Sequence, residues 1–584
     1  MKKTMKHIYG IGCVLVASLI CSCSDLDRET PTTMDEEAIA TEYGNLQGQV
    51  INLYTGMRDG HFLIGNAMMA SLSDEAEYTL QGDAQVFNSG SWNQYVNPDD
   101  VWSHYFTYIR RVNTYLESAE RFEVNLDAYK LDPSENAQEI YKTRSEDVVN
   151  WKREARFLRA YFYFELIKRY GGVPLLTEAL PLDADFANIQ RNTLQECVDF
   201  IADECTILGG EGENGEEDAL PVVYNNDNLG RVTRGAALAL KSRLLLYAAS
   251  DLWNTSSWAE GYAHPELITL DPKGRQERWA EAAKAAKAVI DLESEAGYGL
   301  MDRYTDLGKT FQSPELILVR RISSNTNTFE RNNFPSGFPN GGGGITPSQN
   351  LVDAYEMADG SKFDWNNPAH AADPYANRDP RLAMTVFMNG DTFKDVVLET
   401  FEGGINKDVE NGTLTGYYLR KFVDTNINLV SGTTSNHPWP IFRISEIYLN
   451  YAEALNEAEP GNPDILIYAN KTRERKDVNM PPIGNGSQAE IRERIRNERR
   501  VELAFEDHRL WDTRRWMTAT TELNSPLEGV KIVKNDADGT FAYEKVTVEN
   551  RVFSPKMYFY PIPGSVILNE QVIAAGWPQN PIWE

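Results

Sequence analysis

Apolar residues recur at three- and four-residue spacings in separate blocks along the chain, the pattern of helices with one buried face. In block 100–122, for example, Trp102, Tyr105, Ile109 and Val112 fall on one side of a helix. Similar blocks lie at 34–56, 148–170, 193–208, 233–250, 277–293, 441–459, 463–475 and 488–507. Alanines gather on possible packing faces in 233–250 and 277–293, as closely packed helix pairs require. The pattern therefore predicts a mainly α-helical chain built from paired helices.

Long irregular stretches separate these blocks. Residues 72–99 and 322–347 are rich in Asp, Asn, Gly and aromatic residues, and the stretches 361–440 and 517–584 contain short strand-like pieces. A β-hairpin is predicted over 530–534 and 541–548, around the turn Asp538-Gly539. Loops of this length in a compact body are usually functional or disordered, and their aromatic residues argue against disorder.

The first residues have the layout of an export signal. Lys2, Lys3 and Lys6 precede an apolar run over 8–20, which is shorter than the about 18–20 residues that span a bilayer. Ile20-Cys21-Ser22-Cys23 follows and looks like a bacterial lipobox, with Cys23 as the acylated first residue of the mature chain. We expect an exported protein tethered by lipid; an ordinary signal peptide is the alternative.

Two cysteines remain after such processing. Cys197 and Cys205 are eight residues apart on a predicted helix that begins at Thr193, with Glu196 completing a capping box. Eight helical residues rise about 12 Å, whereas the Cα atoms of a disulfide lie within about 7 Å. Both cysteines are predicted to be separate, reduced core residues.

Charge and composition limit the classes of molecule that the protein can bind. The 584 residues are 42% hydrophobic and 24% charged, with a formal net charge of −29. Nucleic acid is an unsuitable partner, because phosphate binding depends on basic patches. No cofactor-binding motif is present: Gly341–Gly344 lacks the context of a phosphate loop.

Five motifs occur together in one order. They are EARFLRAYFYF (154–164) leading into YGGVPL (170–175), PSQNLVDAYEMADG (347–360), RISEIYLNYAEA (443–454), IRNERRVELAFE (495–506) and YFYPIP (558–563). In this order they resemble the SusD/RagB family, the surface lipoproteins of Bacteroidetes-type nutrient-uptake systems. The resemblance extends over essentially the whole chain.

The resemblance implies a fold of about four tetratricopeptide-like helix pairs with a loop-rich, irregular half. The expected pairs are 34–56 with 100–122, 148–170 with 193–208, 233–250 with 277–293, and 441–459 with 463–475. The implied organisation is a signal peptide over 1–22, a lipidated tether over 23–33 and one SusD-like domain over 34–584. Within that domain we expect an N-terminal part over about 34–250 and a C-terminal part over about 277–584.

The implied function is binding without catalysis. Family members capture oligosaccharides or polysaccharides at the outer face of the outer membrane and deliver them to a TonB-dependent, SusC-like transporter. Peptide capture by the same architecture is an alternative, as is a pure protein–protein scaffold. A glycoside hydrolase is a further alternative. Among 86 acidic residues some pair of carboxylates must lie at the spacing that such enzymes use, so the number of carboxylates does not distinguish an enzyme from a binding protein.

The third helical motif could also suggest a catalytic or metal cluster. Glu498, Glu502 and His508 lie close together in sequence, but their spacing matches neither HExxH nor a common zinc pattern. We interpret the alternating Arg and Glu residues of this motif as helix–helix contacts that determine the fold.

In the SusD/RagB family the binding sites tend to lie in the segments that correspond to the loops 72–99 and 322–340, so the resemblance implies ligand contacts there. Trp253, just after the predicted helix 233–250, is a further candidate. Aromatic rings there could stack on sugar faces, and polar side chains could bond the hydroxyl groups. The candidate ligand-binding residues are Asp74, Trp92, Asn93, Tyr95, Trp253, Phe329, Arg331, Asn333, Phe334 and Phe338. Trp92 is the leading candidate, because Ser89, Gly90, Ser91 and Asn93 around it offer little apolar contact.

Overall fold

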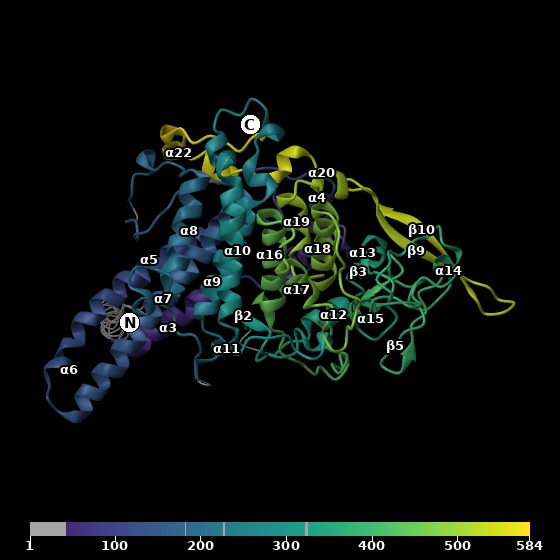
Figure 1. Ribbon diagram of the computed structural model, residues 1–584, viewed down its shortest axis with the longest axis horizontal. Coiled ribbons are helices and arrows are strands. Elements are labelled where there is room, and N and C mark those ends of the chain that lie inside the picture. The colour runs from purple at the N-terminus through teal and green to yellow at the C-terminus, as the bar shows by residue number, and fades with distance from the viewer. Residues whose placement is uncertain (1–41, 182, 226–227, 322–324, 584) are drawn as a thin grey trace, which may run out of the picture.

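The helical half of the protein is a row of helices in which each packs on the next (Figure 1). The computed structural model describes residues 42–181, 183–225, 228–321 and 325–583. The main helices are α3 (Tyr43–Leu53), α5 (Trp102–Asn125), α7 (Glu135–Tyr170), α8 (Leu194–Leu208), α9 (Arg234–Ala249), α10 (Arg275–Asp291), α16 (Ile444–Ala458), α17 (Asp464–Asn470) and α18 (Gln488–Glu502). The four expected pairs are neighbours, since α3 packs on α5, α7 on α8, α9 on α10, and α16 on α17.

Side-chain size explains this close packing. The alanines of α9 and α10 that the sequence pointed to are buried, as are the four apolar residues of the α5 stripe. Thr193 caps α8 in a capping box with Glu196, as predicted. Cys197 and Cys205 are free and buried, and burial raises the pKa of the Cys197 thiol to about 12. The core is therefore held by packing.

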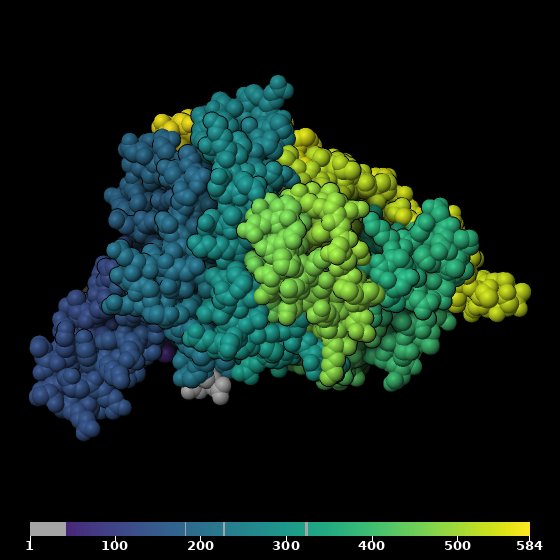
Figure 2. All heavy atoms as spheres, viewed as in Figure 1, coloured from purple at the N-terminus to yellow at the C-terminus, as the bar shows by residue number. Residues whose placement is uncertain are grey.

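Helix α7 begins 13 residues before the predicted start at 148. Ser134 caps it by accepting a hydrogen bond from the Ala137 backbone amide. Most side chains over 135–147 face solvent, so this part lacks the buried stripe by which helices are recognised. With α6 (Asp127–Leu131) it forms an arm that projects from the body (Figure 2).

The loop-rich half contains short elements. Its antiparallel strand pairs are β1 (Ala76–Tyr78) with β3 (Ile345–Pro347), β2 (Leu316–Arg320) with β8 (Trp439–Arg443), β4 (Val386–Phe387) with β7 (Tyr418–Leu419), β5 (Thr392–Phe393) with β6 (Val396–Val397), and β9 (Leu527–Lys534) with β10 (Phe541–Glu549). The predicted hairpin is confirmed as β9–β10, which projects from the body (Figure 1). The shorter helices are α4 (Asp83–Asn88), α11 (Glu293–Ala296), α12 (Thr328–Asn333), α13 (Gln349–Ala354), α14 (Pro368–Ala372), α15 (Pro380–Thr385), α19 (Arg509–Arg515), α20 (Ala519–Glu522), α21 (Gly564–Ile567) and α22 (Glu570–Ala575).

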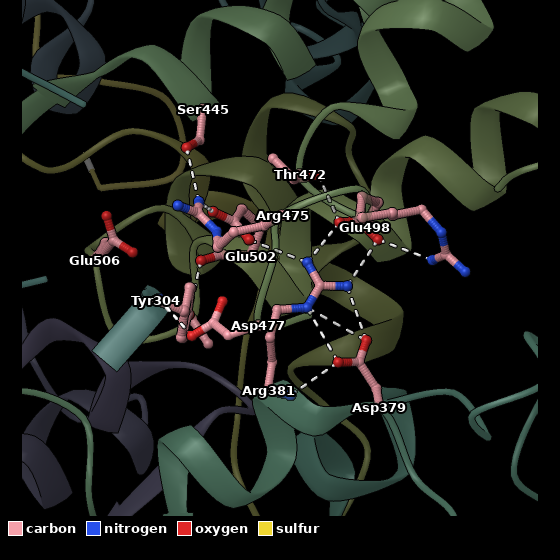
Figure 3. Close-up of polar contacts among 12 residues, drawn as sticks. Tyr304, Asp379, Arg381, Ser445, Thr472, Arg475, Asp477, Glu498, Glu502 and Glu506 are labelled. Atoms are coloured by element: carbon pink, nitrogen blue, oxygen red, sulfur yellow. Dashed lines mark hydrogen bonds and ion pairs between the residues drawn. The ribbon is translucent and has the colours of Figure 1, made fainter. Parts of the chain in front are cut away.

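A buried network of ion pairs joins the two halves. Arg381 of α15 lies between Asp379 and the α18 carboxylates (Figure 3), with its guanidinium 2.5 Å from Glu498 and 3.0 Å from Glu502. Glu502 also accepts hydrogen bonds from Arg443 at 2.7 Å and Arg475 at 2.8 Å. Every one of these side chains is at most 2% exposed.

The electrostatics of this network explain the charged motif in α18. Burial alone would raise the pKa of Glu502, but Arg475, Arg443 and Arg381 outweigh it and hold that pKa well below its ordinary value. Burial and nearby Arg499 lower the pKa of His508 well below its ordinary value. The carboxylates are thus saturated by guanidinium groups, as expected of contacts that determine the fold.

Candidate functional site

Most of the residues predicted to bind ligand are buried. Asp74, Trp92, Trp253, Phe329, Asn333 and Phe334 are each at most 7% exposed. Of the others, Asn93, Tyr95 and Arg331 are exposed and Phe338 is half-buried. Cys23 lies outside the described residues.

Trp92 is a core residue, which corrects the expectation that it lacks apolar partners. Its ring stacks on Phe87 at 5.1 Å between centroids and meets Tyr560 at 5.1 Å and Trp583 at 4.8 Å. Only 1% of the residue is exposed, so no ring face is open to a sugar. Two of these partners come from the last thirty residues, which the local sequence around Trp92 cannot reveal.

Asp74 is also engaged in contacts within the protein. Its carboxylate accepts hydrogen bonds of 2.7 Å from both Arg500 and Arg509. Burial would raise the pKa of Asp74, but these two guanidinium groups outweigh it and lower the pKa. Burial and the Asp74 charge raise the pKa of neighbouring Glu75 to about 8. Asp74 therefore ties the loop 72–99 to the helical half.

The second predicted loop also turns its aromatic residues inward. Phe329 meets His61 edge-on at 4.8 Å, and Phe334 meets Phe393 in the same way at 4.9 Å. Asn333 donates to the Phe329 carbonyl and accepts from the Ile345 amide. Trp253 packs edge-on against Tyr247 at 6.0 Å. For these four residues we find packing roles in place of the predicted ligand contacts.

The two predicted loops do lie side by side. Strand β1 from the first pairs with β3 directly after the second, and the Tyr78 hydroxyl donates to Asn332 at 3.2 Å. Arg331 is exposed next to this junction. The two loops are therefore neighbours in the fold, while most of their aromatic side chains point inward.

An aromatic depression of about 320 Å³ lies where α5, the segment 174–189 and the C-terminal helices α21 and α22 meet. We call it the Tyr95 groove. Its lining residues are Trp102, Phe106, Ile109, Arg110, Asn113, Pro174, Leu176, Glu178, Leu180, Phe186, Ile189, Ser565, Val566, Asn569, Val572 and Trp577. The rings of Trp102 and Phe106 are 4.8 Å apart, and Trp577 lies 6.2 Å from Trp102.

Tyr95, which is 69% exposed, does not line this groove itself but contacts Gly564, the residue directly before Ser565 of the lining. A Cβ on Gly564 would come within 2.6 Å of the Tyr95 ring, so only glycine allows this contact, and Ser565 next to it lines the groove. The Gly564 amide donates to the Gln94 carbonyl at 2.8 Å, which fixes the loop on this segment. Asn93 forms the turn by accepting from the Tyr95 amide at 2.8 Å. An exposed ring is thus held in a defined place.

Polar groups surround the aromatic walls. Arg110 and Glu178 are exposed, and Asn113 donates to the Leu176 and Glu178 carbonyls at 2.9 and 3.0 Å. Sequence reasoning missed this groove because Trp102 and Phe106 belong to an amphipathic helix. Trp577, in addition, lies more than 470 residues further along the chain.

Neither a metal centre nor a membrane-spanning helix is found in the described ranges. No three His, Cys, Asp or Glu side chains within them gather as metal ligands would. None of the helices there has both the length and the apolar character needed to cross a bilayer.

A scaffold of helix pairs with a loop-rich half defines a fold of the tetratricopeptide-like class. Residues 314–583 match the model of the SusD family, and residues 24–246 match a model described as starch-binding associating with outer membrane. The chain belongs to the SusD/RagB family.

SusD-like proteins are also found among the relatives in sequence and among the solved structures with a similar fold. SusD-like protein P38 of Formosa agariphila is 24% identical over 386 residues, covering 65% of this chain and 68% of that protein. SusD-like protein P25 of the same organism is 22% identical over 451 residues, covering 72% and 71%. A SusD-like protein from Bacteroides fragilis is 25% identical, with a TM-score of 0.73 over 94% of this chain and 98% of that one. A SusD-like carbohydrate binding protein from the same species superposes with a TM-score of 0.68 over 90% and 98% of the two chains, at 23% identity.

Proposed function

We propose that this protein captures oligosaccharides or polysaccharides at the cell surface, without cleaving them, and that the Tyr95 groove holds the sugar. The observation that carries this proposal is a groove walled by Trp102, Phe106 and Trp577, which an exposed tyrosine adjoins through its contact with Gly564, in a member of the SusD/RagB family. Sugars present apolar C–H faces to aromatic rings and hydroxyl groups to a polar rim. The groove offers both kinds of surface.

Replacing Tyr95 by alanine should weaken glycan binding about 5- to 10-fold, because one aromatic contact contributes roughly 1 kcal/mol. The melting temperature should stay nearly unchanged, since the ring is mostly exposed. Titration calorimetry of the two proteins with the same bound oligosaccharide measures the difference.

Tyr141 provides the control, because it is a half-exposed tyrosine on the projecting arm, where Lys130 lies over its ring. Tyr141→Ala should bind with wild-type affinity. Equal affinities for wild type and Tyr95→Ala would remove Tyr95 from the site.

The protein is proposed to be anchored in the outer membrane through Cys23 and to face outward. The support is the lipobox-like sequence Ile20-Cys21-Ser22-Cys23 and the family model named for association with the outer membrane. Cys23→Ala should release the protein from membranes and abolish labelling by fed palmitate. Two or more acyl chains give stable anchoring, so high salt should not release the unmodified protein. A mutant that stays membrane-bound and labelled would contradict the assignment.

Delivery to a SusC-like, TonB-dependent transporter completes the proposal. Membership of the SusD/RagB family supports it. Purification in mild detergent should recover a large outer-membrane barrel with the protein. Recovery of the free protein alone would contradict a stable complex.

A further inference from the structure

A second depression, larger and much more polar than the Tyr95 groove, lies along α18. On one side of the helix a cavity of about 1050 Å³ separates α18 from α13 and the start of β9. On the other side a cavity of about 750 Å³ lies between α18 and the first turns of α10. Both are lined by Glu493, Arg496 and Trp516, so they form one continuous surface, which we call the α18 groove.

Its aromatic residues are not platforms for sugar rings. The Trp516 ring has the guanidinium groups of Arg496 and Arg515 each 4.6 Å from its centre, and it is 6% exposed. Phe363 is covered by Arg378 at 4.1 Å. A ligand here would be recognised by charge and hydrogen bonds.

The carboxylates of the larger cavity are already engaged. Among its described lining residues, each carboxylate except Glu493 accepts a hydrogen bond from another group. The pairs are Asp74 with Arg500 and Arg509, Asp353 with Lys545, Glu356 with Arg473, Glu490 with Ser487, Glu522 with Arg509, and Glu528 with Lys545. Glu493 is 70% exposed and points its charge at solvent.

Three cationic side chains of the same cavity are, by contrast, weakly paired. Arg494 lies 4.0 Å from Glu356, which is already bonded to Arg473 at 2.7 Å. Arg496 lies 3.8 Å from exposed Glu493, and its buried Nε has no hydrogen-bond partner. Lys362 is exposed and makes no ion pair within the described part of the chain. Among the described residues none of the three has a carboxylate closer than 3.8 Å, on a chain with a net charge of −29.

We infer that the α18 groove binds the acidic groups of an anionic oligosaccharide, with Arg494, Arg496 and Lys362 receiving its carboxylate or sulfate oxygens. Guanidinium groups bind such planar or tetrahedral anions through paired, charge-assisted hydrogen bonds. The cavity exceeds the about 300–1,000 Å³ typical of small-ligand sites, so several sugar residues fit. This inference rests on the proposed function and adds a second site and a ligand class to it.

The test compares three oligosaccharide probes of equal length: a galacturonic-acid oligomer, a sulfated galactan oligomer and a neutral galactan oligomer. Calorimetry at low salt should show at least tenfold tighter binding of one or both acidic probes than of the neutral probe. The tighter of the two identifies carboxylate or sulfate as the preferred group. This preference should shrink at high ionic strength, because salt screens partly exposed charges.

Double variants at Arg494 and Arg496 test whether the acidic oligosaccharide binds in the α18 groove. Replacing Arg494 and Arg496 together by glutamine should weaken acidic binding at least tenfold. The Arg494→Lys, Arg496→Lys protein keeps both charges but loses the paired hydrogen bonds, so its affinity should lie between that of the glutamine variant and that of wild type. A matched control removes the same charge from the projecting arm, with Lys142→Gln and Arg144→Gln, and should bind as wild type.

Two outcomes would overturn the inference. One is equal affinity for acidic and neutral probes; the other is acidic binding that the Arg494→Gln, Arg496→Gln protein retains while its melting temperature is unchanged. The proposed function is judged separately, by loss of binding in Tyr95→Ala. A neutral glycan that depends on Tyr95, without any acidic preference, would refute this inference and leave that function standing.

Discussion

Replacing Trp92 by alanine should lower the free energy of unfolding by about 3–5 kcal/mol, the usual cost of removing a large buried aromatic side chain. The indole ring is sandwiched among Phe87, Tyr560 and Trp583 and is 1% exposed. Its loss would leave a cavity where the loop 72–99 packs on the C-terminal segment. The midpoint of urea unfolding measures the effect.

Trp92→Phe serves as the conservative comparison, because it keeps an aromatic ring and should retain most of the stability. An unchanged unfolding midpoint for Trp92→Ala, together with weaker glycan binding, would restore Trp92 to the ligand site. A stability loss without a specific binding change is the expected result.

Replacing Glu502 by glutamine should destabilise the fold by about 3–5 kcal/mol, because removing one partner leaves buried charges uncompensated. Glu502 neutralises Arg381, Arg443 and Arg475, all of which are buried. An uncharged amide of nearly the same size cannot replace that charge. Urea unfolding at neutral pH measures the loss.

Glu493→Gln makes the same chemical change on the exposed face of the same helix and should change stability by less than about 0.5 kcal/mol. Equal stabilities for the Glu502 and Glu493 variants would contradict the role assigned to the buried network. A catalytic or metal-binding role for Glu502 would instead predict that stability is preserved.

Much of the helical half follows from local sequence. The positions of apolar residues predict the main helices, because the buried face of a helix repeats at the helical period whichever element it packs on. The capping box at Thr193 and the hairpin around Asp538-Gly539 are likewise local and are confirmed. The arm over 135–147 was missed because an exposed helix carries no such stripe.

The exposure of the candidate ligand residues is harder to predict from sequence, for a physical reason. An aromatic residue in a polar loop looks exposed until distant segments cover it, as Tyr560 and Trp583 cover Trp92. Conversely, Trp102 looks like an ordinary helix core residue, although it also lines a groove completed by Trp577. Of the ten candidates, Asn93, Tyr95 and Arg331 are exposed in the fold.

Glycan capture without cleavage is tested most directly by affinity electrophoresis in gels that contain soluble polysaccharides, with chain length analysed after incubation. We expect that at least one polysaccharide retards the wild-type protein, that Tyr95→Ala is retarded less, and that the polysaccharide keeps its length. Shortened chains would mark an enzyme. Retention of peptides with no retardation by any polysaccharide would contradict glycan capture.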